Sequence, residues 1–288
     1  MTSETFGADG GTGSAAPTPS LSGLRAPMRR PLFRRLAISY TVNEMGDWLG
    51  LVALAVLVFD ETGSVMATTL LFLGTKFLPA LIAPLLVTRA EHPPPRIALP
   101  VIYVLEAAAF VVLAFLAMNF SLALVLVFAI IDGSLALTGR AVTRAVVASL
   151  LGPAGELRSG NAILNVAFTG GSALGPGLAG IVVAVFSVQA ALMLNAVSFL
   201  AVAALLFTSA NLPRPEIEPG RMRERLRAGF GYIAQRRALI QLLAAQAVAF
   251  IFFAAVIPVE VVYAKVTLDA GDSGYGILLA SWGAGMLI

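Results

Sequence analysis

The sequence predicts an all-α membrane protein that crosses the bilayer several times, and three observations lead to this fold class. Hydrophobic residues make up 58% of the chain and charged residues only 12%, and the mean hydropathy is +0.89. Soluble domains carry about 25% charged residues, and a water-soluble core cannot absorb so much apolar surface. The second observation is a series of long apolar runs, and the third is the distribution of arginines between them.

The apolar runs have the length of about 20 residues that a helix needs to cross roughly 30 Å of hydrocarbon. We expect eight spans, at residues 36–59, 65–87, 97–118, 122–143, 163–186, 190–209 and 239–263, with a last one opening at residue 273. The last run holds only 16 residues, so we expect a truncated second half of the fold.

The arginines fall on alternate connections between these spans. They precede the first span and follow the second, fourth and sixth, whereas Asp60 and Glu61 follow the first span and the third and fifth are followed by neutral residues. Cytoplasmic loops are enriched in Lys and Arg. We therefore expect a multi-pass protein of the bacterial inner, or plasma, membrane, with its N-terminus in the cytoplasm.

The chain divides into four expected parts: a disordered cytoplasmic tail (1–31), an N-terminal six-helix transmembrane bundle (32–209), a cytoplasmic linker (210–237) and a partial C-terminal bundle (238–288). The tail is rich in Gly, Ser, Thr, Ala and Pro, which is typical of disorder. In the linker, apolar residues recur at helical spacing among arginines. This pattern predicts an amphipathic helix on the inner leaflet, or alternatively a solvated linker helix, with the apolar residues Met222, Leu226, Phe230 and Ile233.

Several classes of chemistry are excluded by residue usage. The chain has no cysteine and a single histidine, His92, beside a run of prolines. Disulfides, thiolate nucleophiles and sites built from Cys or His ligands are therefore unavailable. We expect no catalytic residues, no metal, no cofactor and no nucleic-acid partner, so the expected partners are the lipid bilayer and a small-molecule substrate.

Five ionisable residues lie inside the expected spans, where charges are costly and usually functional: Glu44, Asp47, Lys76, Glu106 and Asp132. Asp47 and Lys76 are each about fourteen residues from the turn between spans one and two. They should therefore lie at the same depth and form an ion pair. Glu44 and Asp47 are three residues apart, hence on one helical face.

Glu106 and Asp132 share another level, because each lies about thirteen residues from the turn between spans three and four. If the two carboxylates face each other, one should hold a proton near neutral pH. Arg140 and Arg144 lie near the cytoplasmic end of span four, and Arg89 follows span two. A proton relay with a charged cavity or gate is one interpretation. The alternative is a set of ion pairs that hold the bundle together, with snorkelling arginines.

Span five carries an array of small residues that favours close helix packing. Glycines four residues apart let another backbone approach, and a proline removes a helical hydrogen bond and permits a kink. The array comprises Gly171, Gly175, Pro176 and Gly180.

From about Leu32 to its end, the chain resembles the major facilitator superfamily, specifically its drug:proton antiporter and transmembrane secretion effector branch. The resemblance lies in the opening of span one, in the junction of spans four and five, in the antiporter motif of span five and in the helix before span seven. The matching residues are Phe33, Arg34, Gly46, Asp47, Ala53, Thr62, Gly63, Ser64, Arg144, Ala145, Leu150, Asn161, Ala162, Gly171, Gly175, Pro176, Gly180, Gly229 and Tyr232. The signature between spans two and three departs from the family pattern, because only Arg89 is kept.

The resemblance implies the major facilitator fold, with a complete N-terminal bundle and about eight of the expected twelve spans. It also implies alternating access and proton-coupled efflux of small amphipathic compounds, with the proton gradient as energy source. A non-transporting truncated remnant, or a membrane interaction partner, is the alternative.

Overall fold

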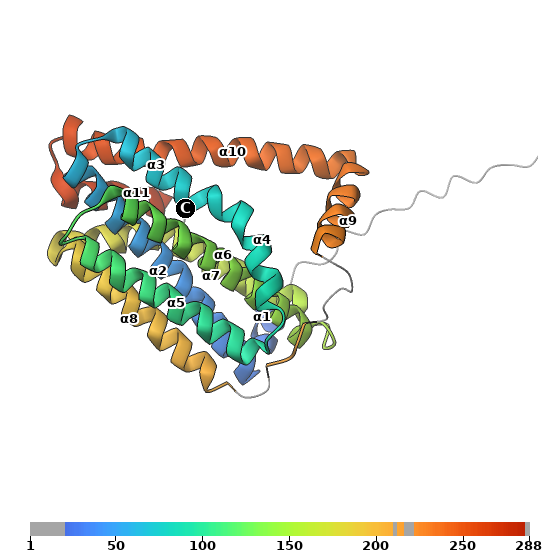
Figure 1. The fold of residues 1–288 in the computed structure, drawn as a ribbon. Helices are drawn as coiled ribbons and strands as arrows, with labels where there is room; N and C mark the ends of the chain where they lie inside the picture. Colours follow the sequence, from blue (N-terminus) through green and yellow to red (C-terminus); the bar gives the residue numbers. More distant parts are fainter. Residues whose placement is uncertain (1–20, 210–211, 216–221, 286–288) are drawn as a thin grey trace, which may run out of the picture.

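The structure is a computed structural model that describes residues 21–209, 212–215 and 222–285. Within these residues the regular elements are all helical (Figure 1). They are α1 (Leu21–Met28), α2 (Pro31–Thr62), α3 (Val65–Lys76), α4 (Leu78–Ala90), α5 (Pro95–Leu116), α6 (Leu122–Leu151), α7 (Leu157–Val185), α8 (Val188–Phe207), α9 (Met222–Ala234), α10 (Arg237–Val262), the π-helix η1 (Tyr263–Thr267) and α11 (Gly271–Gly285).

The described residues contain six helical segments that are long and apolar enough to cross a membrane, when α3 and α4 are taken together. They correspond to the first six predicted spans, so the chain is a multi-pass membrane protein. Helix α10 has 26 residues, and within the part whose side chains are described without a gap, the apolar segment Arg237–Ala249 is shorter than a span. The seventh and eighth spans therefore stay predictions, as does a partial C-terminal bundle.

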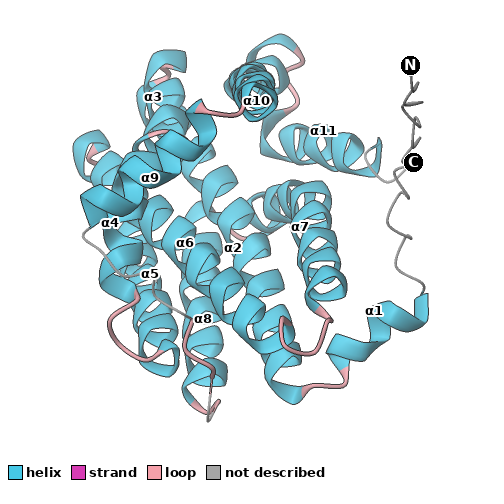
Figure 2. Cartoon of the chain, turned by 90° about the vertical axis from the view of Figure 1, so that its right-hand side faces the viewer, coloured by secondary structure: helices cyan, strands magenta, loops and turns pink. Residues whose placement is uncertain are grey.

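Helix α2 is the centre of the bundle, in contact with α3, α6, α7 and α8 (Figure 2). Its two interior glycines lie on the face toward α8. A Cβ atom at Gly46 would collide with Asn195 of α8, and one at Gly50 would collide with Phe110 of α5. These two glycines therefore let α2 pack closely against α8 and α5. A left-handed residue, Gly63 with φ 58°, ends α2 and leads into the N-cap of α3 at Ser64.

The second predicted span is not one continuous helix. It is divided at Phe77 into α3 and α4. Pro79 has no backbone N–H, so the carbonyl of Thr75 loses the donor that a continuous helix would supply. On the neighbouring α6, Gly133 leaves room for this break, because a Cβ there would lie 2.8 Å from the Thr75 oxygen. We predicted an uninterrupted span, and the break corrects that prediction.

The N-terminal tail also differs from the prediction. Residues 1–20 lie outside the described part, but Leu21–Met28 form α1 within the segment that we expected to be disordered. This helix contacts α7 and α2, so tertiary packing stabilises it. Beside it, Arg30 forms an ion pair with Glu156 at 2.7 Å, which ties the start of α2 to the start of α7.

The last helices meet the bundle at one end and diverge from it at the other. Helix α10 contacts α3, and Figure 1 shows it running away from α4 toward α9. At the joined end Lys265 of η1 forms an ion pair with Asp60 at the end of α2. There α11 also contacts α7, where Gly276 and Gly180 lie against each other. The bundle and the last helices are therefore closed together at the end where α2 leads into α3.

The expected amphipathic helix of the linker corresponds in position to α9. Residues 210–211 and 216–221, which include Arg221, lie outside the described part. Within α9, Phe230 is 69% exposed and Ile233 is half-buried. The helix contacts α10. Its location on the inner leaflet stays a prediction.

Candidate functional site

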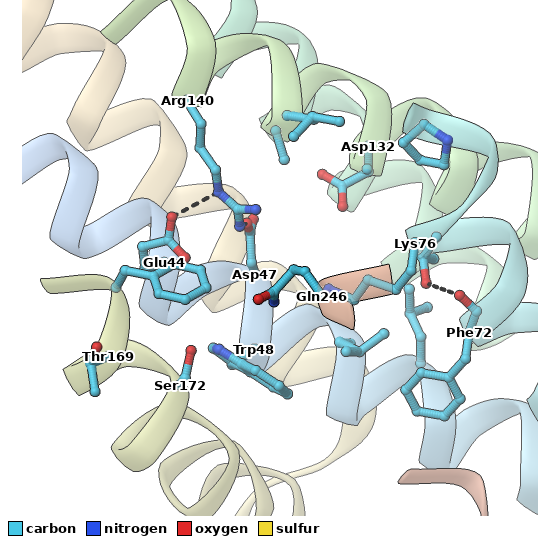
Figure 3. A pocket seen from close by; sticks show the side chains of 18 of the residues that line it. Glu44, Asp47, Trp48, Phe72, Lys76, Asp132, Arg140, Thr169, Ser172 and Gln246 are labelled. Atoms are coloured by element: carbon cyan, nitrogen blue, oxygen red, sulfur yellow. Dashed lines mark hydrogen bonds and ion pairs between the residues drawn. The ribbon is translucent and has the colours of Figure 1, made fainter. Parts of the chain in front are cut away.

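A cavity of about 620 Å3 lies between the bundle and α10. Its walls come from α2, α3, α4, α6, α7 and α10, which places the predicted ionisable residues of spans one, two and four around one space (Figure 3). The charged residues of the wall are Glu44, Asp47, Lys76, Asp132 and Arg140. Its apolar residues include Trp48, Leu51, Leu54, Phe72 and Phe168. The cavity therefore combines an apolar surface with a few charges at membrane depth.

Arg140 of α6 holds the two carboxylates of α2 together. Its Nε lies 2.7 Å from Oε1 of Glu44 as an ion pair, without hydrogen-bond geometry, and a terminal nitrogen donates to Asp47 Oδ2. Asp47 also accepts from the Asn43 amide at 3.4 Å. The Glu44 side chain is 1% exposed, Asp47 11% and Arg140 22%. Two carboxylates thus share one cation in the wall of the cavity.

Lys76 does not form the predicted pair with Asp47. Both residues line the cavity, but the Asp47 carboxylate forms its ion pair with Arg140. Among the described residues, Lys76 forms no ion pair, and its ammonium lies 5.6 Å from the centroid of the Trp48 ring. The depth estimate from the hairpin did not include the rotation of the helices about their axes. That rotation turns Asp47 toward α6.

Glu106 and Asp132 occupy different surroundings. Asp132 lines the cavity, whereas Glu106 is absent from its wall and fully buried. Neither Glu106 oxygen has a hydrogen-bond partner, so the two carboxyl groups do not bind each other directly. The predicted equal depth of Glu106 and Asp132 therefore does not place them in one site.

The other predicted arginines lie outside the cavity wall. Arg144, one turn beyond Arg140, donates to the Tyr40 hydroxyl at 3.0 Å and to Asn165 at 3.2 Å. It therefore links α6 to α2 and α7. Arg89 is exposed in the last turn of α4, where the free carbonyls favour a cation. A gating ion pair at Arg89 is not formed among the described residues.

Two glycines of span five pack closely against cavity residues of α2. A Cβ at Gly171 would lie 2.9 Å from the Glu44 Cβ, and a Cβ at Gly175 would lie 2.7 Å from the Trp48 Cβ. Gly180 instead meets α11, and Pro176 is buried within a helix that continues through it. Gly171 and Gly175 therefore allow the close approach of α7 to α2 at Glu44 and Trp48.

Sequence reasoning did not assign three residues to the site. Trp48 follows Asp47 directly, Asn43 lies one turn before it, and Gln246 reaches the cavity from α10. Asn43 carried a detectable signal, because residues four apart share a helical face and its amide can donate to Asp47. Within the described residues, no group of three or more His, Asp or Glu could hold a metal ion.

A multi-pass helical bundle with a partly charged central cavity is typical of membrane transporters. Residues 22–288 match the model of the transmembrane secretion effector family, and the chain belongs to this family of the major facilitator superfamily. The resemblance found in the sequence is thereby confirmed. No curated protein and no solved structure matches the chain.

Proposed function

We propose that this chain is a proton-coupled secondary transporter that exports a small amphipathic compound by alternating access. The observation that carries the proposal is the Glu44–Arg140–Asp47 cluster in the wall of the cavity. An amphipathic compound suits the cavity, because ligand sites are mostly apolar with a few placed polar groups.

The cluster has the composition that proton coupling requires. One guanidinium faces two carboxylates, so the cluster carries one negative charge more than Arg140 balances. A proton on either carboxylate removes this excess and weakens one of the two ion pairs. Because Arg140 belongs to α6 and both carboxylates to α2, protonation changes the force between two helices of the cavity wall.

The shape of the structure is consistent with one state of such a cycle. The bundle and the last helices meet at the Asp60–Lys265 end. With the N-terminus in the cytoplasm of a bacterial cell, as the arginine distribution predicts, this end is the outer one. The cavity then belongs to an inward-facing arrangement, and export requires the outer contacts to open.

The test is transport by the purified full-length protein in lipid vesicles under an imposed pH gradient, with a cationic, a neutral and an anionic fluorescent dye. We expect flux of at least one dye above that of empty vesicles, and its loss in Asp47→Asn. The control is Asp269→Asn, the same change at an exposed turn residue with φ 50°, a conformation that asparagine tolerates. Undiminished flux in Asp47→Asn would refute the proposed coupling site.

A further inference from the structure

One cation of the cavity wall, Lys76, forms no direct ion pair within the described residues. The chain has only two lysines among its 19 basic residues. Lys265 is paired with Asp60 at the end of the molecule, and Lys76 is in the cavity wall. Arginine supplies every other positive charge, including the one that holds the cluster. Lys76 therefore differs from the arginines in its chemistry and from Lys265 in its surroundings.

None of the carboxylates in the cavity wall forms an ion pair with Lys76. Glu44 and Asp47 are held by Arg140, and among the described residues none lies within ion-pair distance of the Lys76 ammonium. Asp132 also lines the cavity, but its Oδ1 is sealed from solvent and has no partner. The half-buried Lys76 side chain reaches the space itself, toward Trp48 (Figure 3). An incoming molecule therefore meets an ammonium whose contact in the protein is an aromatic ring.

Two features of the local structure keep a cation at this position. Lys76 is the last residue of α3, and the free carbonyls at a helix C-terminus favour positive charge. The Trp48 ring lies within the range of a cation–π interaction at 5.6 Å. An intramembrane ammonium that forms no direct ion pair is costly and indicates a functional site.

We propose that the transported compound carries an acidic group, and that Lys76 binds this group while the apolar wall holds the rest of the molecule. This inference rests on the proposed transport function and names the substrate class of the same cavity. Gln246 of α10 lines the same cavity as Lys76 (Figure 3) and has an amide that can donate to the same acid. The acid is thereby bound between α3 of the bundle and α10, so that substrate connects the two parts that must separate during transport.

The experiment compares three probes that differ in the polar group on one aromatic ring system: the carboxylate 1-naphthaleneacetate, the alcohol 1-naphthaleneethanol and the amine 1-naphthylmethylamine. Their binding to the whole chain in nanodiscs of neutral lipid is measured by calorimetry at neutral pH. We expect the acid to bind at least tenfold more tightly than the alcohol, and the amine to bind most weakly. This preference should disappear in Lys76→Met, while the affinity for the alcohol is kept.

The matched control is Lys265→Met, which removes the other lysine and should keep the preference for the acid. Lys76→Arg keeps the positive charge and should also keep the preference for the acid. This variant shows whether a change at position 76 by itself prevents folding. Equal binding of acid and alcohol, or tighter binding of the amine, overturns the inference. Asp47-dependent transport of the amine in vesicles would then leave the proposed function standing, whereas absence of flux for all three probes would count against both.

Discussion

At the scale of single residues, the arrangement of one arginine and two carboxylates explains why Arg140 is more than a snorkelling side chain. Its guanidinium presents donors in a planar fork, so it can hold Glu44 and Asp47 at the same time. A lysine at this position could not reproduce the geometry. Breaking a buried ion pair by removal of one partner is costly, because it leaves uncompensated charge.

Replacement of Arg140 tests this reading through stability. Arg140→Gln leaves two carboxylates facing each other without a cation, and we expect a loss of about 3–5 kcal/mol. The measurement is thermal unfolding of the purified protein in detergent. The triple change Arg140→Gln, Glu44→Gln and Asp47→Asn removes all three charges and should recover most of the loss while transport stays absent. Equal melting temperatures for wild type and Arg140→Gln would contradict the role of the ion pairs.

At the scale of helices, hydropathy and arginine distribution predicted the first six spans, because the bilayer imposes a length and a polarity on each of them. The break at Phe77 was not predicted, although Pro79 was a visible signal for it. The partner of Asp47 could not be predicted from depth alone. Two residues on a hairpin can share a level, yet the rotation of each helix decides which neighbour they face, and α6 supplied that neighbour.

The packing of α7 on α2 gives a prediction with an adjacent control. A methyl group at Gly175 would lie 2.7 Å from the Trp48 Cβ, so α7 must move away from α2. We expect Gly175→Ala to destabilise the protein by about 1–3 kcal/mol. Gly170→Ala places the methyl group where no heavy atom lies within 4 Å, so it should be neutral or slightly stabilising. Thermal unfolding of both variants decides this, and an equal effect at the two positions would refute the close-contact role of Gly175.

At the scale of the whole molecule, the orientation in the membrane rests on the alternation of arginines. We expect residues 10 and 220 to be cytoplasmic and the connections at Ser121 and Ser187 to be external. The chain has no cysteine, so a single cysteine introduced at each position reports its side without a background signal. Labelling by an impermeant reagent in intact cells should occur at 121 and 187 only. Reaction at residue 10 or 220 from outside would show that the predicted topology is wrong.

The central claim is that proton binding at the α2–α6 cluster controls which end of the cavity is open, and distances between spin labels at the two ends test it most directly. One pair is Ala154→Cys with Ala238→Cys at the inner end, and the other is Met118→Cys with Leu268→Cys at the closed end. Between neutral and acidic pH, we predict that the two distances change in opposite directions in the otherwise unaltered protein. In Asp47→Asn, each pair should keep one distance at every pH. Distances that ignore pH in both proteins, or that respond to pH equally in Asp47→Asn, would contradict the claim.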